Sequence, residues 1–208
     1  MNIVIAGPQG SGKGTQAELI AKKYLLTHVS AGDVLREEMA KKTVLGQEIS
    51  NIINKGNLIP DTLMNEVMEK KILDLKKQNI LFDGYPRTKD QTEFITSTLQ
   101  IDKIIELTLT DGQAVERLST RRVCEKCGMN FNTVTLKPKK EGVCDSCGGK
   151  LIQRADDYPD AIKKRLADYH KNNRPVMSLL KSKAKYYKVD GSPSIEEIFK
   201  KICSLLGT

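Results

Sequence analysis

Residues 7–15 read Gly7-Pro8-Gln9-Gly10-Ser11-Gly12-Lys13-Gly14-Thr15. An apolar run rich in β-branched residues, 3–6, precedes this stretch, and residues 16–24 follow it with apolar side chains at helical spacing. This order predicts a strand, a glycine-rich turn and a helix, the context that separates a phosphate-binding loop from a chance match. Because glycine has no Cβ, we expect the turn to present backbone N–H groups to an anion at the positive end of the helix. Lys13 adds a full charge, and Thr15 adds a hydroxyl that can lie near a magnesium ion.

The loop departs from the general pattern G-x-x-x-x-G-K-[ST], because Gly14 follows Lys13 where Ser or Thr is usual. The alternative interpretation is a glycine-rich hairpin with an incidental lysine. Four glycines, Lys13 and the flanking elements together favour the phosphate-binding loop. The Gly-Lys-Gly-Thr ending resembles that of the small kinases that phosphorylate nucleoside monophosphates.

Composition is typical of one globular domain with room for a small insertion. The chain has 208 residues, of which 39% are hydrophobic and 29% charged. No run approaches the roughly 20 apolar residues that cross a bilayer, and the N-terminus enters the loop without a charged leader, so we expect a cytoplasmic protein. The net charge of +8 fits nucleic acid, an anionic membrane surface or polyphosphate substrates. Lysine pairs scatter along the chain, which is typical of a solvated surface.

The hydrophobic pattern predicts alternating strands and helices. Strands are expected at 27–30, 79–83, 103–109 and 186–190. Helices are expected from residue 31, at 45–55 with Gly56 as the C-cap, 61–76, 89–99, 113–122, 158–185 with a kink or break at Arg174-Pro175, and 194–206. The alternation favours an α/β fold with a parallel sheet covered on both faces. Asp83 would then lie at the carboxyl end of a buried strand, where such sheets bind ligands.

Four cysteines form two C-x2-C pairs, Cys124/Cys127 and Cys144/Cys147, separated by sixteen residues. This spacing indicates zinc, and four thiolates fill a tetrahedral site and leave no position for water, so the metal would be structural. Residues 123–154 have few large apolar side chains, and we expect an inserted subdomain without a core of its own. A redox dithiol and a structural disulfide pair remain alternatives. Cys203 is expected to be a buried small hydrophobe.

Arginines bracket the cysteine insertion. Arg117 and Arg121 are four residues apart in a predicted helix and would share one face, while Arg154 and Arg165 follow the insertion. A hinged flap with guanidinium groups at its base can close over phosphates and exclude water. The alternative is that these are surface arginines paired with Asp156, Asp157 or Glu116.

Arg36 and Arg87 form a second set, because both follow predicted strand ends. Arg36 and Arg87 would bind a second phosphate group. Two phosphate sites joined by one loop imply transfer between two nucleotides.

Together these motifs resemble adenylate kinase, in the long form with a zinc-bearing lid, over the full length of the chain. The resemblance is carried by residues 7–15, 30–36, 56–61, 82–88, 117–124 and 153–157 and by the two cysteine pairs. It implies a P-loop three-layer α/β fold with a central parallel five-stranded sheet. It also implies a core of residues 1–29, 60–121 and 160–208, a helical nucleoside-monophosphate-binding segment at 30–59, and a lid at 122–159.

The resemblance implies the reaction ATP + AMP ⇌ 2 ADP with Mg²⁺, in a monomer without nucleic-acid or membrane partners. The implied ATP-binding residues are Gly10, Ser11, Gly12, Lys13, Gly14, Thr15, Arg117, Arg121, Asn130, Phe131 and Pro193. The implied AMP-binding residues are Ala31, Arg36, Asn57, Leu58, Ile59, Gly84, Tyr85, Pro86, Arg87, Gln91, Arg154 and Arg165. The implied catalytic residues are Lys13, Arg36, Arg87, Arg121, Arg154 and Arg165. Asp83 would order the waters of Mg²⁺, and Cys124, Cys127, Cys144 and Cys147 would bind Zn²⁺.

Two departures from the family pattern matter. Pro8-Gln9 stands where the family usually has a small residue and then proline, and Ala31 stands where a threonine usually helps to hold AMP. Loss of one such hydrogen bond costs about 0.5–1.5 kcal/mol, so weaker AMP binding is expected rather than a new substrate.

Two other functions remain as alternatives. One keeps the fold and changes the acceptor to UMP, CMP or GMP. The other is a nucleic-acid-binding zinc-ribbon protein, which an aromatic content of 5% and the scattered positive charge disfavour.

Overall fold

The computed structural model describes residues 1–54 and 59–207. Its central sheet has five parallel strands in the order β2-β3-β1-β4-β8. The strands are β1 (Ile3–Ala6), β2 (Thr27–Ser30), β3 (Ile80–Asp83), β4 (Lys103–Thr108) and β8 (Lys185–Asp190). The predicted α/β class and parallel sheet are therefore confirmed, and each expected strand is present within one residue of its predicted ends.

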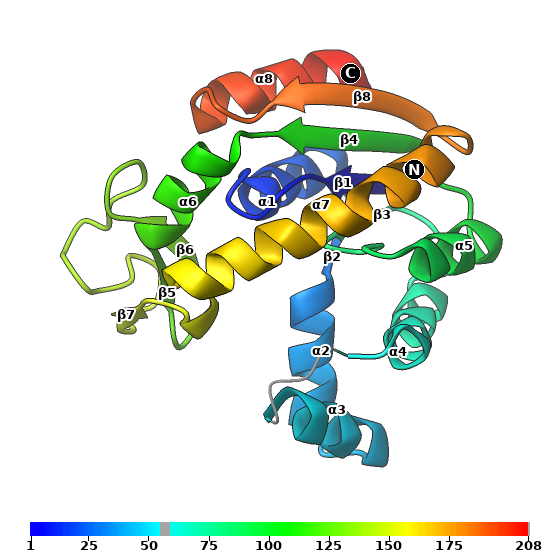
Figure 1. Cartoon of the computed structure of the whole chain (residues 1–208), viewed down its shortest axis with the longest axis horizontal. Helices are drawn as coiled ribbons and strands as arrows, with labels where there is room; N and C mark the ends of the chain where they lie inside the picture. Colours follow the sequence, from blue (N-terminus) through cyan, green and yellow to red (C-terminus); the bar gives the residue numbers. More distant parts are fainter. Residues whose placement is uncertain (55–58, 208) are drawn as a thin grey trace.

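Helices cover both faces of the sheet (Figure 1). They are α1 (Lys13–Tyr24), α2 (Ala31–Ala40), α3 (Val44–Asn54), α4 (Asp61–Asp74), α5 (Lys89–Thr98), α6 (Asp111–Ser119), α7 (Pro159–Lys181) and α8 (Ile195–Leu206). Ile3 and Ile5 of β1 pack with α1 and α8, while Val4 between them packs with helices of the other face. Since side chains alternate along a strand, both faces of β1 are apolar and the strand is buried on both sides. No helix in the described part of the chain is long and apolar enough to span a membrane.

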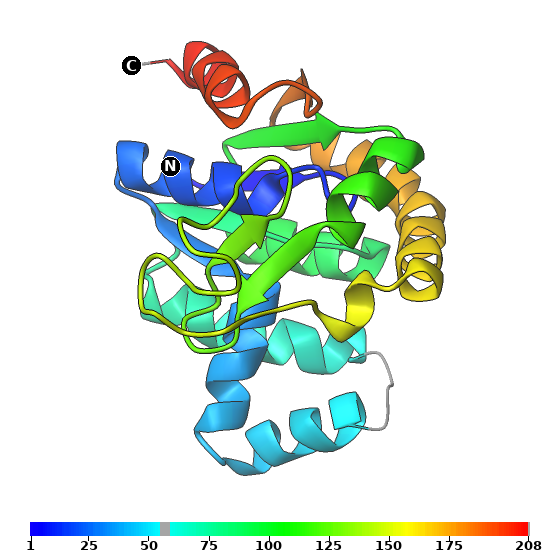
Figure 2. The same cartoon turned by 90° about the vertical axis from the view of Figure 1, so that its left-hand side faces the viewer.

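A small antiparallel sheet forms a separate lobe (Figure 2). Its strands are β5 (Arg121–Cys124), β6 (Asn130–Asn132) and β7 (Leu151–Ile152), in the order β6-β5-β7, and the short helix η1 (Ala155–Asp157) follows them. The expectation that this insertion has no core of its own is wrong. Phe131 and Leu151 pack against Cys124 and Cys144 in a minimal buried cluster, so the cysteine side chains are themselves part of its core.

Helix α6 corrects a second expectation, because it ends at Ser119 and does not reach residue 122. Thr120 is the C-cap, and Arg121 opens β5, where it pairs with Asn132. Arg117 and Arg121 therefore do not share a helix face. The ladder to β6 and β7 overrides a local sequence that is compatible with helix.

Helix α7 continues through Pro175 as one helix of 23 residues, so the predicted break at this position is wrong. Val176, Met177 and Leu180 follow the proline and are buried against the sheet. Their packing offsets the hydrogen bond that proline cannot donate. The predicted C-cap Gly56 lies outside the described residues.

Helices α2 and α3 form an arm that projects from the sheet (Figure 1). The helices approach closely at Gly46, where a Cβ would lie 2.3 Å from the carbonyl oxygen of Glu38. The Glu38 carboxylate accepts hydrogen bonds from Lys41 and Thr43, which close the turn between the helices.

Candidate functional site

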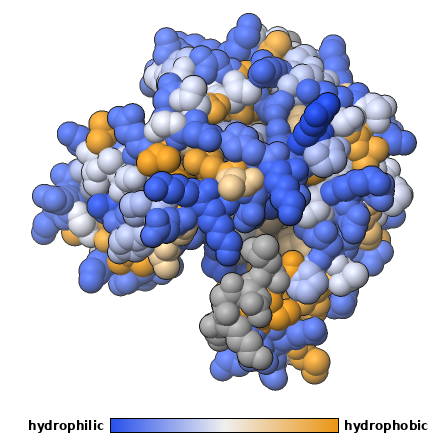
Figure 3. Space-filling model, viewed as in Figure 1, coloured by the Kyte–Doolittle hydropathy of each residue, from blue (hydrophilic) through white to orange (hydrophobic). Residues whose placement is uncertain are grey.

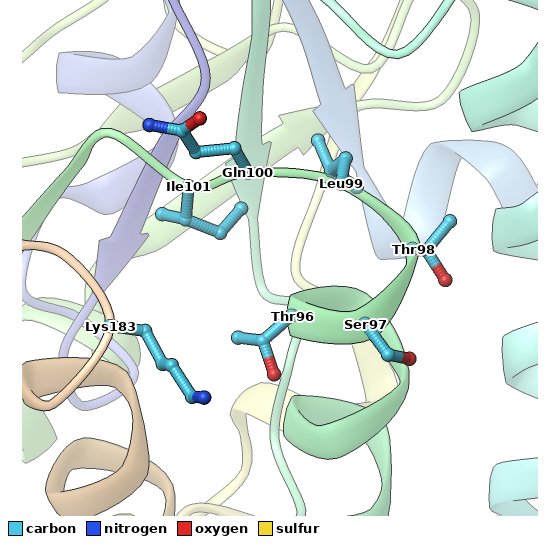
Figure 4. Close-up of a pocket in the computed structure, with 7 residues that line it drawn as sticks. All are labelled: Thr96, Ser97, Thr98, Leu99, Gln100, Ile101 and Lys183. Atoms are coloured by element: carbon cyan, nitrogen blue, oxygen red, sulfur yellow. The ribbon is translucent and has the colours of Figure 1, made fainter.

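The candidate site lies at the carboxyl ends of the parallel strands, where the polypeptide leaves Ala6, Ser30, Asp83, Thr108 and Asp190. The molecular surface is hollowed there between the lobe of β5–β7 and the α2–α3 arm (Figure 3). A separate pocket at the end of α5 does not belong to this region (Figure 4). It is lined by Thr96, Ser97, Thr98, Leu99, Gln100, Ile101 and Lys183. Ile101 precedes β4, so this pocket lies near the amino-terminal end of that strand, whereas the candidate site lies at the carboxyl ends.

The glycine-rich loop between β1 and α1 has the geometry of an anion cradle. Gly7 has φ 141°, and a Cβ there would lie 2.4 Å from the carbonyl oxygen of Leu107. Gly12 caps α1 with φ 87° and supplies no side-chain hydrogen bond, which leaves the first N–H groups of the helix available to a ligand.

Buried polar atoms without a partner gather in this loop and in the first turn of α1. Among the described residues, four buried side-chain oxygen or nitrogen atoms have no hydrogen-bond partner, and three of them belong to Gln9, Ser11 and Gln16. Such atoms are rare in folded proteins, so their concentration beside the loop is a sign of a ligand site.

The Lys13 ammonium group lies against the loop, where Nζ donates to the carbonyl oxygens of Gly7 (2.7 Å) and Pro8 (2.8 Å). Burial lowers the pKa of Lys13 from 10.5 to about 8. The charge of Asp83 partly offsets this shift in pKa, whereas three guanidinium groups add to it, those of Arg87, Arg165 and Arg121. The site therefore has an excess of positive charge that a polyphosphate would neutralise.

Asp83 ends β3 directly beneath the loop. A Cβ at Gly14 would lie 3.4 Å from Asp83 Oδ2, and the carboxylate side chain is 15% exposed. His28 Nε2 lies 3.5 Å from the same oxygen and has no hydrogen-bond partner among the described residues. Oxygen ligands next to a phosphate loop fit Mg²⁺ and its waters, with Thr15 one residue beyond Gly14.

Two aspartates hold the arginines at the base of the β5–β7 lobe. Arg121 donates two hydrogen bonds to Asp157, Nε to Oδ2 at 2.7 Å and Nη2 to Oδ1 at 2.6 Å. Arg165 Nη1 lies 3.0 Å from Asp156 Oδ2 and 3.4 Å from Asp157 Oδ1, and Arg154 makes two 2.9 Å bonds to Asp156. The pairing with Asp156 and Asp157 that was the alternative interpretation is thus present. This pairing holds the three guanidinium groups next to one another at the base of the lobe.

The carboxylates of Asp156 and Asp157 differ in their exposure to solvent. The Asp157 side chain is 0% exposed, whereas that of Asp156 is 36% exposed. Burial raises the pKa of Asp156, but the positive charges of Arg165, Arg154 and Arg121 outweigh burial and hold that pKa below its ordinary value. Asp157 is therefore the buried counter-charge of the cluster.

Arg117 binds the backbone of the neighbouring loop after β8. It donates to the carbonyl oxygens of Gly191 (2.7 Å) and Ser192 (2.9 Å). A Cβ at Gly191 would lie 3.1 Å from the carbonyl oxygen of Ser11, so the loop that carries the exposed Pro193 lies against the phosphate loop.

In the lobe, Asn130 is exposed and the Phe131 side chain is buried among the cysteines. A contact of Phe131 with a ligand would have to come from its backbone.

The residues expected to hold an acceptor nucleotide are distributed between the arm and the loop after β3. Ala31 is buried at the first position of α2, whereas Arg36 is exposed, pairs with Asp33 and lies outside the guanidinium cluster. Arg87 Nε donates to the carbonyl oxygen of Gly84 at 2.6 Å. The residues Tyr85 and Pro86, joined by a cis peptide, are buried, Gln91 is buried, and Ile59 is half-buried. Asn57 and Leu58 lie outside the described residues.

The four patterned cysteines come together at the end of the lobe. Their Sγ atoms all lie within 4.8 Å of one another, with Cys124–Cys147 at 3.5 Å and Cys127–Cys144 at 3.6 Å. These distances exceed the ~2.05 Å of a disulfide. They approach the ~3.8 Å separation that follows from tetrahedral Zn–S bonds of about 2.3 Å. The donor set therefore fits a zinc ion.

Some positions differ from expectation or gave no signal in the sequence. Cys203 is half-buried rather than buried. Asp61 contacts Gln91 and Thr88, about thirty residues away, and no local pattern indicated these bonds. Asn132 ties the lobe to the end of α6 by donating to Arg117 O (3.1 Å) and Thr120 Oγ1 (2.9 Å).

Comparison with known proteins gives one consistent result. A family model described as "Adenylate kinase" matches residues 5–185. The adenylate kinase of Fervidobacterium nodosum is 41% identical over 213 residues, covering 100% of this chain and 98% of the relative. Those of Pyrococcus horikoshii (41%) and Clostridium tetani (39%) cover 99% and 100% of this chain and 96% and 99% of their own.

Proposed function

The chain belongs to the adenylate kinase family, and from this premise we propose that it catalyses reversible, Mg²⁺-dependent phosphoryl transfer, ATP + AMP ⇌ 2 ADP. The single observation that carries the proposal is the position of Lys13. Its ammonium group lies on the glycine loop, within the electrostatic reach of three arginines that come from different elements. Such a set of fixed positive charges is suited to the oxygens of a transferring phosphoryl group.

On the donor side, the loop and the N-terminus of α1 would bind the phosphates of ATP. Lys13 would exchange the carbonyl oxygens of Gly7 and Pro8 for phosphate oxygens. The adenine would lie near Arg117 and Pro193, because Arg117 already orders the loop that carries Pro193.

On the acceptor side, Arg87 and Arg36 would hold the phosphate of AMP, with Arg154 and Arg165 between the two nucleotides. The attacking oxygen belongs to an anionic phosphate, so no general base is required. The residues act by position and charge, and closure of the lobe of β5–β7 would keep water from acting as acceptor.

Magnesium, when bound, neutralises charge on the phosphates of ATP. Asp83 would hold the waters of the ion through its carboxylate oxygens, and Thr15 would offer its hydroxyl oxygen.

The proposal is tested by measuring ADP formation with ATP and each monophosphate in turn. We expect kcat/KM for AMP to exceed that for CMP and UMP by at least about tenfold, or about 1.4 kcal/mol. Equal values for AMP and either pyrimidine nucleotide would overturn the assignment of the acceptor. Action as a monomer, without nucleic-acid or membrane partners, stays a prediction.

We also propose that the four cysteines bind a structural zinc ion whose binding energy stabilises the lobe. Replacing Cys144 with serine is expected to lower the melting temperature and loosen zinc, while the phosphate loop still binds ATP. Cys203→Ser is the matched control and should leave zinc content unchanged, since Cys203 lies on α8 outside the cluster. If chelation left the melting temperature of the native chain unchanged, a structural zinc would be excluded.

A further inference from the structure

We propose that Gln9 is a further catalytic residue, whose side-chain amide donates a hydrogen bond to the phosphoryl group as this group moves between the two nucleotides. The inference rests on the proposed function, because it takes the glycine loop to hold the outer phosphates of ATP. It adds a side-chain amide to a loop that would otherwise act through its backbone N–H groups and Lys13.

Gln9 lies at the corner of a tight turn within the glycine loop. The backbone N–H of Ser11 donates to the carbonyl oxygen of Pro8 at 3.2 Å, and Gly10 has φ 83° whereas Gln9 is not among the residues with positive φ. These features define a type II turn, in which the third position needs glycine and proline is favoured at the second. Gln9 occupies the second position, so the geometry of the turn does not itself require a glutamine.

The turn brings Gln9 next to the charged groups of the site. The carbonyl oxygen of Pro8, the residue before Gln9, accepts a hydrogen bond from Lys13 Nζ at 2.8 Å. The ammonium group of Lys13 is in turn within the electrostatic reach of Arg121 and Arg165. A side chain that starts at residue 9 is therefore one residue away from the cation that would meet the outer phosphates.

The amide of Gln9 is not held by the rest of the protein. Oε1 is buried and has no hydrogen-bond partner, and within residues 1–54 and 59–207 neither Nε2 nor the backbone N–H of Gln9 makes a hydrogen bond. A buried polar atom without a partner is rare and calls for an explanation, and a ligand site supplies one. The last torsion of a glutamine side chain is broad, so the amide can turn its NH₂ group toward a ligand.

A phosphoryl group in transfer matches both ends of this amide. Negative charge is spread over its three equatorial oxygens, which can only accept hydrogen bonds. The Gln9 NH₂ group would donate to one of them, and Oε1 would then face an ammonium group and guanidinium groups, which can only donate. Because the amide is neutral, it adds a donor without adding to the positive charge that already lowers the pKa of Lys13.

Gln9→Pro gives the sharpest test, because proline suits the second position of a type II turn and has no side-chain donor. We expect kcat for ADP formation to fall at least about tenfold, the smaller loss typical of one hydrogen bond to a charged group, with KM for ATP and AMP changed by less than about threefold. The melting temperature of the ligand-free protein should equal or exceed that of the native chain, since proline restricts the unfolded state. A purely structural role of Gln9 in the turn predicts an unchanged kcat instead.

Gln9→Glu and Gln78→Glu make the same chemical change at two positions. A carboxylate at position 9 would oppose like charge to the phosphoryl oxygens, so kcat should fall further than in Gln9→Pro. Gln78 is exposed between α4 and β3, and its replacement should leave kcat unchanged.

A second measurement separates the phosphoryl group in transfer from the bound nucleotides. Aluminium fluoride, added with Mg²⁺, ADP and AMP, takes the place of that group between the two nucleotides. The native protein should bind this complete set at least about tenfold more tightly than Gln9→Pro does, whereas ADP alone should bind equally to both. Equal affinities for the complete set, or a kcat of Gln9→Pro within about threefold of the native value, would overturn the role of Gln9. Absence of ADP formation by the native chain would instead overturn the proposed function.

Discussion

Replacing Lys13 with methionine is expected to lower kcat/KM for ATP and AMP on the order of a thousandfold, the effect of removing one well-placed charged donor from a phosphoryl-transfer site. The ligand-free protein should nevertheless be at least as stable as the native one. Burial and three neighbouring guanidinium groups disfavour the ammonium group before a ligand binds. Steady-state kinetics and thermal unfolding check the two effects separately.

The stability difference should depend on pH in a defined direction. The pKa of Lys13 is about 8 in the folded protein against 10.5 for an unperturbed lysine. Between these values the unfolded chain binds more protons, so the free energy of unfolding of the native protein rises as the pH rises from 8 to 10.5. Methionine does not titrate, and the relative advantage of the variant should therefore be largest below pH 8 and shrink toward pH 10.5.

Lys22→Met is the matched control for this prediction. Lys22 lies on the same helix and is exposed, so its loss should change neither kinetics nor the pH dependence of stability. Retention of more than a tenth of the native activity by Lys13→Met would show that Lys13 does not meet the transferred group.

Replacing Asp157 with asparagine is expected to lower the free energy of unfolding by about 3 kcal/mol, the lower end of the cost of removing one partner from a buried ion pair. Asp157 is 0% exposed and carries both hydrogen bonds of the Arg121 fork. Asparagine keeps the shape but removes the charge, and it turns an NH₂ group toward the guanidinium. Urea unfolding followed by circular dichroism gives the measurement.

Two neighbouring carboxylates provide graded controls. Asp156→Asn should cost less, because this side chain is 36% exposed and solvent screens its charge. Asp160→Asn, at an exposed position in the first turn of α7, should cost only a few tenths of a kcal/mol. If all three variants lay within about 0.5 kcal/mol of the native protein, Asp157 would not be the counter-charge that preorganises the arginines.

Local patterns were sufficient to predict most of the fold. Short apolar runs such as residues 3–6 and 80–82 predicted the parallel strands, and the glycine spacing predicted the turn before α1. The spacing of the two C-x2-C pairs predicted a cluster because this pattern is typical of zinc binding, which brings four thiolates together. In each of these cases local preference and tertiary packing agree.

The wrong expectations share a different cause, which is long-range pairing. Residues 113–122 have a helical pattern, yet Arg121 joins a strand because Asn132 is available as its partner. Pro175 signals a break, yet the buried face of α7 keeps the helix continuous. Likewise, Asp156 and Asp157 were recognisable as possible partners of arginines, but which guanidinium each one holds is decided by the fold of the lobe. The bonds of Asp61 to Gln91 and Thr88 carry no local signal at all.

The central claim is that two nucleotides meet end to end over the glycine loop, between Lys13 and the arginines of the lobe. A crystal structure with a bisubstrate dinucleotide, two adenosines joined by a polyphosphate, tests it most directly. The phosphate chain should lie within hydrogen-bond distance of Lys13 Nζ and of the guanidinium groups of Arg121 and Arg165, with Lys13 no longer donating to Gly7 and Pro8. A phosphate chain lying away from Lys13 and these arginines, with the ammonium group still on the two carbonyl oxygens, would contradict the account.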